Sequence, residues 1–491
     1  MAESTTPDAF EQRAVRVGKR QEIIDSGSNP YPAAASADAL TPINMLVDTY
    51  STLPVNHMTD DFVTVIGRVM SARHAGKISF VVLQAGRGAR LQILVSRAII
   101  GDDVHASMKR LVDRGDFISV SGLVGTSMTG ELSVFAQSYT VVSKALRPLP
   151  NTFDDLNEET RVRQPYLSLI VDDVHRTNMV NRSKVISDIR AHLTGDDYLE
   201  VETPILQTMH GGASARPFVT HGNAIDSDLY LRIAPELFLK RAIVGGLDRV
   251  FEINKNFRNE GMDSTHSPEF TMLEAYEVHA DYNGMAELTE SLIGGAASVV
   301  DGLDDERRMA LSVLPFDRIS LYVSLSEFVG ESITPDTSME RLTDLATAYG
   351  VRMDVPTHGK LVEELWEATV KPALVRPTFV FDYPVDSSPL VASHRSIAGV
   401  VEKWDLYIDG FEIATGYSEL VDPIIQRERL VAQSALSGRG DDEAMGLDES
   451  FLTALEYGMP PTGGIGLGID RLMMVLFGTG IRETVLFPLV K

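Results

Sequence analysis

A run of closely spaced glycines near the end of the chain constrains its local structure more than any other feature. Gly463, Gly464, Gly466 and Gly468 are followed by an apolar segment that opens with Asp470 and Arg471. Glycine lets a backbone approach a ligand closely and tolerates positive φ. An arginine just after such a strand presents a planar charged fork suited to a polyphosphate. On its own, such a run is more often a turn beside a surface ion pair.

Two upstream segments predict a long β-hairpin that carries charged and aromatic side chains. Residues 249–260 and 268–276 both alternate apolar and polar residues, as strands do. Arg258 and Glu260 then share one face of the first strand. His266 falls in the connecting loop, and Phe270, Glu274 and Tyr276 share one face of the second strand.

The glycine run and the hairpin resemble the third and second motifs of class II aminoacyl-tRNA synthetases. Residues 181–190 and 198–204 resemble the first motif. Three further runs, 144–150, 211–218 and 230–240, resemble lysyl-tRNA synthetases of the bacterial type. The resemblance covers nearly the whole chain. It implies an α+β fold: an N-terminal five-stranded OB-fold β-barrel, then a class II catalytic domain built on an antiparallel sheet with flanking helices.

Composition sets outer bounds that agree with this resemblance. A chain of 491 residues is long enough for two or three domains. It has no cysteine, which excludes disulfides and thiolate metal sites and fits a reducing cytoplasm. No apolar run approaches the roughly twenty residues of a membrane span, and the N-terminal residues show no export signal. The net charge of −25 argues against coating nucleic acid through bulk electrostatics. We therefore expect a cytoplasmic protein without a membrane partner.

The pattern along the chain predicts three regions. Residues 1–60 form a helical extension, with an amphipathic helix from Glu11 to Ser26. Residues 61–150 contain five short strands, with a helical stretch at 106–112, which suits an OB-fold that binds single-stranded nucleic acid. Residues 146–151 form a linker. Residues 151–491 form the catalytic domain, with an inserted helical subdomain at about 338–371.

The resemblance implies that the chain forms lysyl-adenylate from L-lysine and ATP. This chemistry depends on positioning and on neutralising charge as it develops. Arg258 would bridge the lysine carboxylate and the α-phosphate, and Arg471 would hold the γ-phosphate; both are the implied catalytic residues. The implied ATP-binding set is Arg258, Glu260, His266, Phe270, Glu412, Gly468 and Arg471, with Phe270 stacked on adenine.

A candidate metal site lies in the stretch Trp404–Glu412, which turns at Asp409-Gly410. Asp405 and Glu412 are carboxylates of the kind Mg²⁺ accepts together with phosphate oxygens. The resemblance implies up to three Mg²⁺ ions per subunit. The family usually has glutamate at position 405. The alternative for this stretch is a solvated acidic turn.

Selecting lysine requires carboxylates around its ammonium groups, because an unpaired buried charge is costly. The resemblance assigns Glu419 and Tyr276 to the side-chain amine, and Glu236 with the Gly212 carbonyl to the α-amine. The whole implied lysine-binding set is Gly212, Glu236, Arg258, Glu274, Tyr276, Thr415, Tyr417 and Glu419. Thr415 stands where the family usually has an asparagine that contacts the amino-acid carboxylate.

On the barrel, the resemblance implies anticodon contacts by Arg73, Phe80, Gln92 and Glu131. Phe80 could instead belong to the core. The family often has two consecutive arginines where this chain has Ala72-Arg73. The implied partners are L-lysine, ATP, tRNA(Lys) and a second copy of the chain, which would pair through residues 181–204.

Two other functions remain open from sequence. A divergent paralogue would activate lysine or a lysine-like amino acid for a non-tRNA acceptor, and Thr415, Ala72 and the acidic balance of the chain keep that alternative open. A non-catalytic regulatory protein would have lost Arg258, Glu412 or Arg471, and all of them are present.

Overall fold

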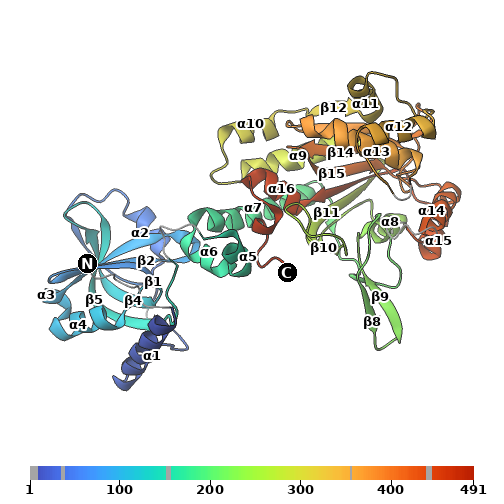
Figure 1. Cartoon of the computed structure of the whole chain (residues 1–491). Helices are drawn as coiled ribbons and strands as arrows, with labels where there is room; N and C mark the ends of the chain where they lie inside the picture. The colour runs from blue at the N-terminus through green and yellow to red at the C-terminus, as the bar shows by residue number, and fades with distance from the viewer. Residues whose placement is uncertain (1–8, 35–38, 151–155, 354–355, 438–444, 491) are drawn as a thin grey trace. The chain divides into compact units, whose positions relative to one another are not determined.

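The computed structural model describes residues 9–34, 39–150, 156–353, 356–437 and 445–490 (Figure 1). The chain divides into two compact units, residues 1–177 and 178–491. Each unit is described by itself. The helices that follow the barrel, up to residue 171, group with the first unit, whereas the sequence had suggested a boundary at 150. The end of the expected linker, Asn151, lies outside the described residues. Within the described part of the chain, no helix has the length and apolar character needed to span a membrane.

The first unit is built around a closed five-stranded barrel, which confirms the expected OB-fold. Around the barrel the strand order is β1-β2-β3-β5-β4; β3 and β5 pair in parallel and the other neighbours are antiparallel. The strands are β1 (Met58–Ala75), β2 (Ile78–Gln84), β3 (Arg90–Ser96), β4 (Phe117–Thr126) and β5 (Leu132–Ser143). The helices are α1 (Ala9–Asp25), α2 (Ile43–Thr49), α3 (Arg97–Ile100), α4 (Asp102–Leu111), α5 (Glu158–Arg163) and α6 (Pro165–Val171), with a 3-10 turn at Gly86–Gly88.

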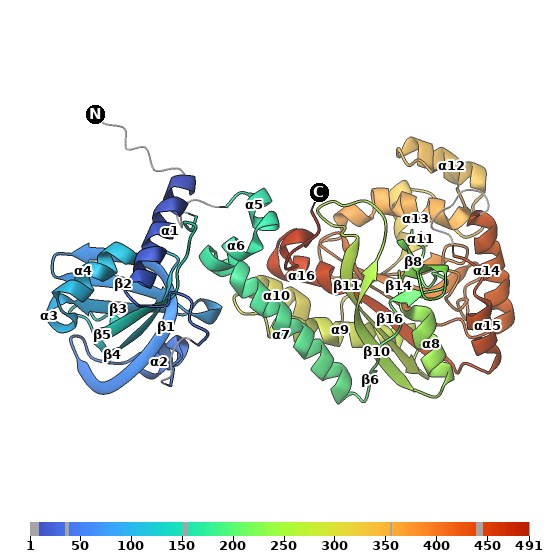
Figure 2. The ribbon, with the colours of Figure 1, turned by 90° about the horizontal axis from the view of Figure 1, so that it is seen from below.

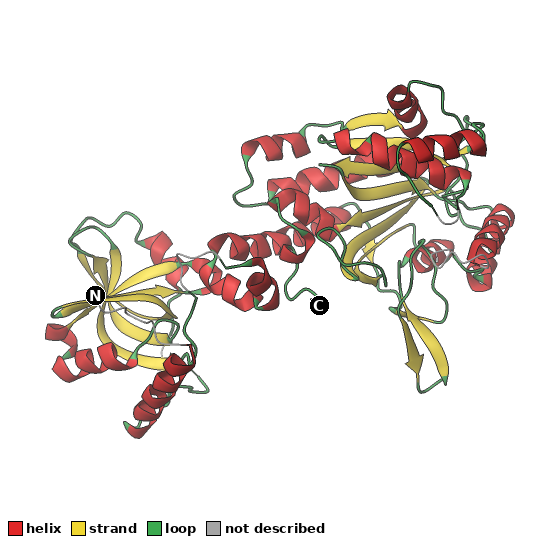
Figure 3. Cartoon of the chain, in the orientation of Figure 1, coloured by secondary structure: helices red, strands yellow, loops and turns green. Residues whose placement is uncertain are grey.

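The second unit contains an eight-stranded sheet, in the order β12-β13-β14-β15-β16-β11-β10-β6 (Figure 3). Its six central strands pair antiparallel, as expected, but both edge strands are parallel to their neighbours, so the sheet is mixed. The strands are β6 (Leu199–Glu200), β10 (Arg249–Phe257), β11 (Glu269–Val278), β12 (Asp317–Ser320), β13 (Thr378–Pro384), β14 (Val400–Ile408), β15 (Phe411–Ser418) and β16 (Thr462–Gly468). A small separate sheet has the order β7-β9-β8: β7 (Leu206–Gln207), β9 (Ser227–Leu231) and β8 (Val219–Gly222).

Helices surround this sheet, and α7 is a long helix that begins in the first unit and continues into the second (Figure 2). The helices are α7 (Asp173–Gly195), α8 (Glu236–Val244), α9 (Tyr282–Ser298), α10 (Asp305–Ser312), α11 (Leu321–Val329), α12 (Met339–Ala348), α13 (His358–Thr369), α14 (Pro423–Ser437), α15 (Glu449–Glu456) and α16 (Ile469–Phe477), with 3-10 turns at Lys371–Ala373 and Ile481–Glu483. Helices α12 and α13 fall in the range of the expected inserted subdomain.

Alternation along the strands gives the sheet one apolar face and one polar face. Leu273, Trp404, Leu406 and Leu467 point into the main core, together with side chains of α9 and α16. The residues between them point to the opposite face. In register across that face lie Asp405 with Thr415, Thr415 with Gly466, and Gly466 with Glu274. The polar face of the sheet therefore gathers the residues singled out from the sequence.

The β10–β11 hairpin has the expected pairing, but its first strand is shorter than expected. Strand β10 ends at Phe257, so Arg258 and Glu260 lie in the connecting loop and not on a strand face. The amide of Arg258 still donates across the hairpin to the carbonyl of Pro268, at 2.9 Å. The next amide, that of Asn259, donates instead to the carbonyl of Arg216, at 2.7 Å, so the pairing of the hairpin ends there. Phe270, Glu274 and Tyr276 do share one face of β11, as expected.

Arg182 of α7 links the three sequence motifs inside the second unit. Its Nη2 lies 2.6 Å from a carboxylate oxygen of Asp470 and donates to Thr271 Oγ1 at 3.1 Å. Asp470 also accepts from the amide of Thr271, at 2.8 Å. Both charged groups are largely removed from water, so the pair orients the start of α16 relative to the hairpin.

Candidate active site

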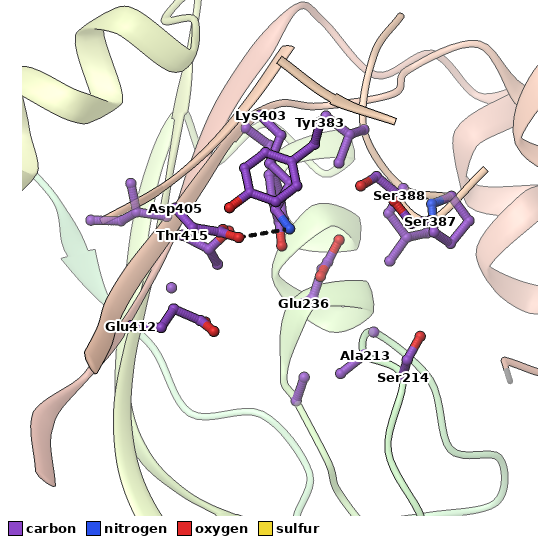
Figure 4. A pocket seen from close by; sticks show the side chains of 18 of the residues that line it. Ala213, Ser214, Glu236, Tyr383, Ser387, Ser388, Lys403, Asp405, Glu412 and Thr415 are labelled. Carbon is purple, nitrogen blue, oxygen red and sulfur yellow. Dashed lines mark ion pairs between the residues drawn. The ribbon is translucent and has the colours of Figure 1, made fainter. Parts of the chain in front are cut away.

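Two adjoining cavities lie on the polar face of the sheet. One has a volume of about 320 Å³ and is shown in Figure 4. The other has a volume of about 210 Å³. The residues that line both cavities are Arg258, Met272, Glu412, Thr415 and Gly466. Two ligands could therefore meet beside Arg258, one from each cavity.

The smaller cavity contains every residue expected to bind ATP. Glu260, His266, Phe270, Gly468 and Arg471 line it in addition to the shared Arg258 and Glu412. It is bounded by the hairpin loop on one side and by the end of β16 and the start of α16 on the other. Residues that are far apart along the chain, and that the sequence predicts to bind ATP, therefore lie together in one cavity.

Arg258 is not tied up in an ion pair. Its guanidinium carbon lies 5.1 Å from the centre of the Phe270 ring. Among the described residues no carboxylate forms an ion pair with it, and its buried Nε has no hydrogen-bond partner. Burial lowers the pKa of Arg258, although arginine remains charged in proteins. The fork is therefore free to receive an anion.

Arg471 is held by groups on both sides of the cavity. Its Nη1 donates to the carbonyl of Glu412 at 2.9 Å, and the Glu412 carboxylate lies 3.8 Å away. Its Nη2 lies 3.3 Å from His266 Nε2. Asp263 fixes the loop that carries His266, because its Oδ1 accepts the amide of His266 at 2.8 Å. Hydrogen bonding to Thr265 keeps the pKa of Asp263 well below its usual range.

The larger cavity contains most of the expected lysine-binding residues. Gly212, Glu236, Glu274, Tyr276, Thr415 and Tyr417 line it. Gly212 has a φ of +88°, and a Cβ there would crowd Glu236 and Ala234. Tyr276 donates to Glu274 Oε2 at 3.0 Å. In Figure 4, Glu236 of α8 stands on one side of this cavity and Asp405 with Thr415 on another.

Glu419 lies behind the cavity wall and does not line it. Its side chain is fully buried, and its Oε2 lies 2.5 Å from Nζ of Lys240, which is also fully buried. The same Nζ lies 2.6 Å from Glu236 Oε1. Gly464 leaves room for this arrangement, since a Cβ there would overlap both Glu419 Oε1 and the Tyr276 ring. Glu419 therefore forms an ion pair with Lys240, and its expected contact with lysine stays a prediction.

The buried acids of this region are hard to ionise. Burial, reinforced by Glu236, raises the pKa of Glu419 to about 7, although Lys240 opposes the shift. Burial and the charge of Glu236 also raise the pKa of Glu274 well above its usual range. A cationic ligand would stabilise the ionised forms of both groups.

We expect the Michaelis constant for a diammonium ligand such as lysine to rise as pH falls below about 7. The raised pKa of Glu419 means that its charge is present above pH 7 and lost below it. A neutral acid attracts an ammonium group only weakly, and the lysine ammonium stays charged throughout this range. Steady-state kinetics between pH 6 and about 8.5 would measure the effect. A flat profile, or the same slope in Glu419→Gln, would contradict this assignment.

Asp405 and Glu412, the expected metal ligands, come from adjacent strands and differ in their surroundings. Asp405 is buried, and its Oδ2 lies 3.0 Å from Nζ of Lys403 (Figure 4). Its Oδ1 has no hydrogen-bond partner among the described residues. The Glu412 side chain is 43% exposed. One unpartnered buried oxygen and a nearby open carboxylate fit a Mg²⁺ ion completed by phosphate oxygens. In the described part of the chain, no group of three or more metal-binding side chains forms a self-sufficient site.

Sequence reasoning missed two lysines, the buried Lys240 and the partly buried Lys403. Each had a local signal. Glu236 and Lys240 are spaced four apart on one helix, which brings side chains together. Lys403 and Asp405 are spaced two apart on one strand, which places them on the same face. Tyr383, Glu363 and Ser387 also line the larger cavity and were not anticipated.

The expected anticodon-binding residues lie on the outer side of the barrel. Val81 and Ile93 point into the core, so their neighbours Phe80 and Gln92 point outward. Phe80 therefore does not belong to the core. The Arg73 guanidinium carbon lies 5.0 Å from the centre of the Phe80 ring, directly across the β1–β2 pair. Gln92 donates to Ser133 at 2.9 Å, and Glu131 is exposed between β4 and β5.

Comparison with known proteins agrees with this architecture. Residues 157–491 match the family model of tRNA synthetases class II (D, K and N). Residues 63–142 match the model of the OB-fold nucleic acid binding domain. The lysine–tRNA ligase of Kineococcus radiotolerans is 54% identical, over 99% of this chain and 98% of that protein. The lysine–tRNA ligase of Mycolicibacterium gilvum is 52% identical, over 100% and 99%.

A third relative is a longer protein. The lysylphosphatidylglycerol biosynthesis bifunctional protein LysX of Mycolicibacterium vanbaalenii is 43% identical over 100% of this chain, which corresponds to only 44% of that protein. Fold, cavities and full-length similarity agree: the chain belongs to the class II tRNA synthetases and, within them, to the lysine–tRNA ligase family.

Proposed function

We propose that the chain activates L-lysine with ATP and transfers the lysyl group to tRNA(Lys). The observation that carries this proposal is the position of Arg258. It lines both cavities, it lacks an ion-pair partner among the described side chains, and its buried Nε has no hydrogen-bond partner there. Family membership and the two-cavity site support the same reaction.

In the proposed first step, a carboxylate oxygen of lysine attacks the α-phosphorus of ATP. The new C–O–P linkage forms as the bond to the β-phosphate oxygen breaks, which yields lysyl-adenylate and pyrophosphate. Arg258 would stabilise the charge on the α-phosphoryl oxygens, and Arg471, across the smaller cavity, would hold the outer phosphates. Phe270 would supply the stacking surface for adenine. Each arginine is in place before the ligands arrive, which avoids a reorganisation cost.

Mg²⁺ is a proposed cofactor of this site. Glu412 and the unpartnered Oδ1 of Asp405 would hold it. When bound, it would neutralise charge on the ATP phosphates. Because aspartate is one methylene shorter than the usual glutamate and Lys403 occupies its other oxygen, we propose a more weakly held ion at this position.

Lysine selection is assigned to the acids of the larger cavity. Glu236 and Glu274 line it directly, and Tyr276 donates to Glu274. Tyr417 would flank the aliphatic stem. Glu419 would act on the side-chain ammonium from behind the wall, through the field of its charge. This arrangement favours a ligand with two ammonium groups.

We expect Thr415→Asn to lower the lysine Michaelis constant several-fold, up to about tenfold. The Thr415 hydroxyl donates to the carbonyl of Trp404 at 3.3 Å and so does not serve a ligand carboxylate. An asparagine would restore a neutral donor, which contributes about 0.5–1.5 kcal/mol. Pyrophosphate exchange at varied lysine and varied ATP would measure this, with the ATP constant unchanged. Weaker use of lysine, or activation of another amino acid by the variant, would favour the paralogue.

Charging of tRNA tests the proposed acceptor. The purified protein should esterify tRNA(Lys) with lysine in the presence of ATP. In Phe80→Ala the tRNA Michaelis constant should rise by about tenfold, because one stacked base contributes about 1–3 kcal/mol, while pyrophosphate exchange stays unchanged. Val81→Ala, one position along the same strand but in the core, is the matched control for barrel stability. Exchange without charging would favour the non-tRNA acceptor.

We also propose a cytoplasmic homodimer built through residues 181–204. That segment comprises the second half of α7 and strand β6, which lies at the edge of the sheet. A two-fold interface needs one self-complementary surface on each copy. Leu199, Ile205 and Leu206 are exposed apolar residues in or beside this segment. Light scattering at micromolar concentration should give the mass of two chains; a monomer would contradict the proposal.

A further inference from the structure

Lys240 is a buried cation at the centre of the acids of the larger cavity. It belongs to α8, and none of its side chain is exposed. Its ammonium group meets three acceptors that come from different parts of the chain. They are Glu236 Oε1 at 2.6 Å, Glu419 Oε2 at 2.5 Å and the carbonyl of Leu390 at 3.4 Å. An ammonium has three N–H donors, so all of them are engaged inside the protein.

Lys240 is absent from the wall of the cavity, and so it does not contact a ligand there. It acts instead through Glu236, which does line the cavity, and Glu419, which lies behind it. Burial by itself would lower the pKa of Lys240, but the two carboxylates outweigh it and raise that pKa, so the group is charged. Without this cation, two buried carboxylates would face each other with no neutralising partner.

The charges around the cavity suggest what Lys240 does. With a cationic ligand to stabilise their ionised forms, Glu236, Glu274 and Glu419 would carry three negative charges at the end of the cavity next to Lys240, and Lys240 supplies one positive charge. Other charged groups of the cavity wall lie outside this cluster: Lys403 pairs with Asp405, Glu412 is assigned above to the metal, and Glu363 accepts a hydrogen bond from Ser387. The remaining two negative charges of the cluster equal the two ammonium groups of lysine. The lysine carboxylate is met separately by Arg258.

We propose that Lys240 is a positioning residue that matches the charge of the cluster Glu236, Glu274 and Glu419 to a diammonium amino acid, by cancelling one of these three carboxylates and holding Glu236 and Glu419 in place. This inference rests on the proposed activation of lysine. It assigns specificity to a residue that never touches the substrate. The pocket would reject amino acids with one ammonium group because one negative charge would remain unmatched in a buried site.

The first test is Lys240→Met, which keeps an unbranched side chain of nearly the same length and removes its charge. In pyrophosphate exchange, the lysine Michaelis constant should rise about ten- to a hundredfold, as expected for weakening a charge-assisted contact. The ATP constant should stay within about threefold. The control is Arg241→Met, next along α8, which breaks an ion pair with Asp448 at 2.7 Å outside the cavity. It should leave lysine use unchanged.

The second test is chemical rescue, which a purely structural role would not show. Lys240→Ala lacks a three-carbon stem and its ammonium, which propylammonium would replace. Propylammonium should restore lysine use by at least about fivefold, and 1-propanol of the same shape should not. A lysine constant within threefold in Lys240→Met, or a loss accompanied by a lower melting temperature without rescue, would overturn the proposal.

A third variant tests the proposal if Lys240→Met does not fold. The double substitution Lys240→Met with Glu419→Gln removes both charges of one buried pair and leaves the pocket with two negative charges. It should fold and keep a lysine constant lower than that of Glu419→Gln alone. A higher constant would overturn the charge-matching proposal. Unmodified protein that activates no lysine would instead refute the proposed function itself, so the two failures are distinguishable.

Discussion

Replacing Arg258 with alanine should reduce lysine-dependent pyrophosphate exchange by about a hundred- to a thousandfold while the protein stays folded. Arg258 lines both cavities and stacks over Phe270, and the described residues include no carboxylate that is paired with it. Its removal would take away the charge aimed at the α-phosphoryl group as the transition state forms, where a single well-placed donor is worth about a hundred- to a thousandfold. Arg258 makes few interactions that stabilise the fold, so the melting temperature should change by only a few degrees.

Arg249→Ala is the matched control for this variant. Arg249 belongs to the same hairpin, but it pairs with Glu277 at 2.6 Å and is absent from both cavities. Its loss should leave exchange within about threefold, as for an exposed ion pair. Exchange by Arg258→Ala within tenfold of the unmodified protein would remove Arg258 from the mechanism.

Gly464→Ala should lower the catalytic efficiency for lysine by about a hundredfold without affecting ATP. An added Cβ would overlap Glu419 Oε1 and the ring of Tyr276, and neither can move freely because both are buried. Overpacking of this kind costs about 1–3 kcal/mol, and here it would displace the groups that face the lysine ammonium. Exchange kinetics at varied lysine and ATP would measure it.

Gly18→Ala provides the control, since Gly18 lies inside α1 and nothing lies within 4 Å of a Cβ there. It should be neutral or slightly stabilising. If Gly464→Ala used lysine normally, the packing of Glu419 and Tyr276 would not explain why position 464 is a glycine.

The hairpin shows both the reach and the limit of reasoning from sequence. Period-two alternation correctly placed Phe270, Glu274 and Tyr276 on one face, because β11 pairs along its whole length. It failed at Arg258 and Glu260, because the Asn259 amide bonds to Arg216, a residue distant in sequence. The alternation of residues along one segment does not show which distant carbonyl will accept a hydrogen bond from its amides.

The glycine run shows the same limit. The sequence indicated that a ligand would lie close to the backbone of this run. In the structure, neighbouring side chains also lie close to it. Gly464 accommodates Glu419 and Tyr276, whereas Gly466 and Gly468 line the cavities. The Lys240–Glu419 ion pair could not be predicted, because α8 and the end of β15 are brought together only by the sheet order.

The barrel and the sheet order followed from the family resemblance more than from any local signal. Five short strands indicated a barrel, but the parallel β3–β5 pair that closes it depends on contacts distant in sequence. In the same way, the parallel edge strands β6 and β12 made the large sheet mixed where an antiparallel sheet was expected. Neither β6 nor β12 lines the two cavities. The strands that carry the candidate site were therefore predicted better than the edges of the sheet.

Amino-acid-dependent exchange of pyrophosphate into ATP tests the central claim most directly. The unmodified protein should be assayed with each of the standard amino acids at neutral pH, with Arg258→Ala alongside. Lysine alone should support rapid exchange, and Arg258→Ala should abolish it. Equal exchange with a neutral amino acid, or no exchange with lysine, would contradict a pocket built for two ammonium groups beside Arg258.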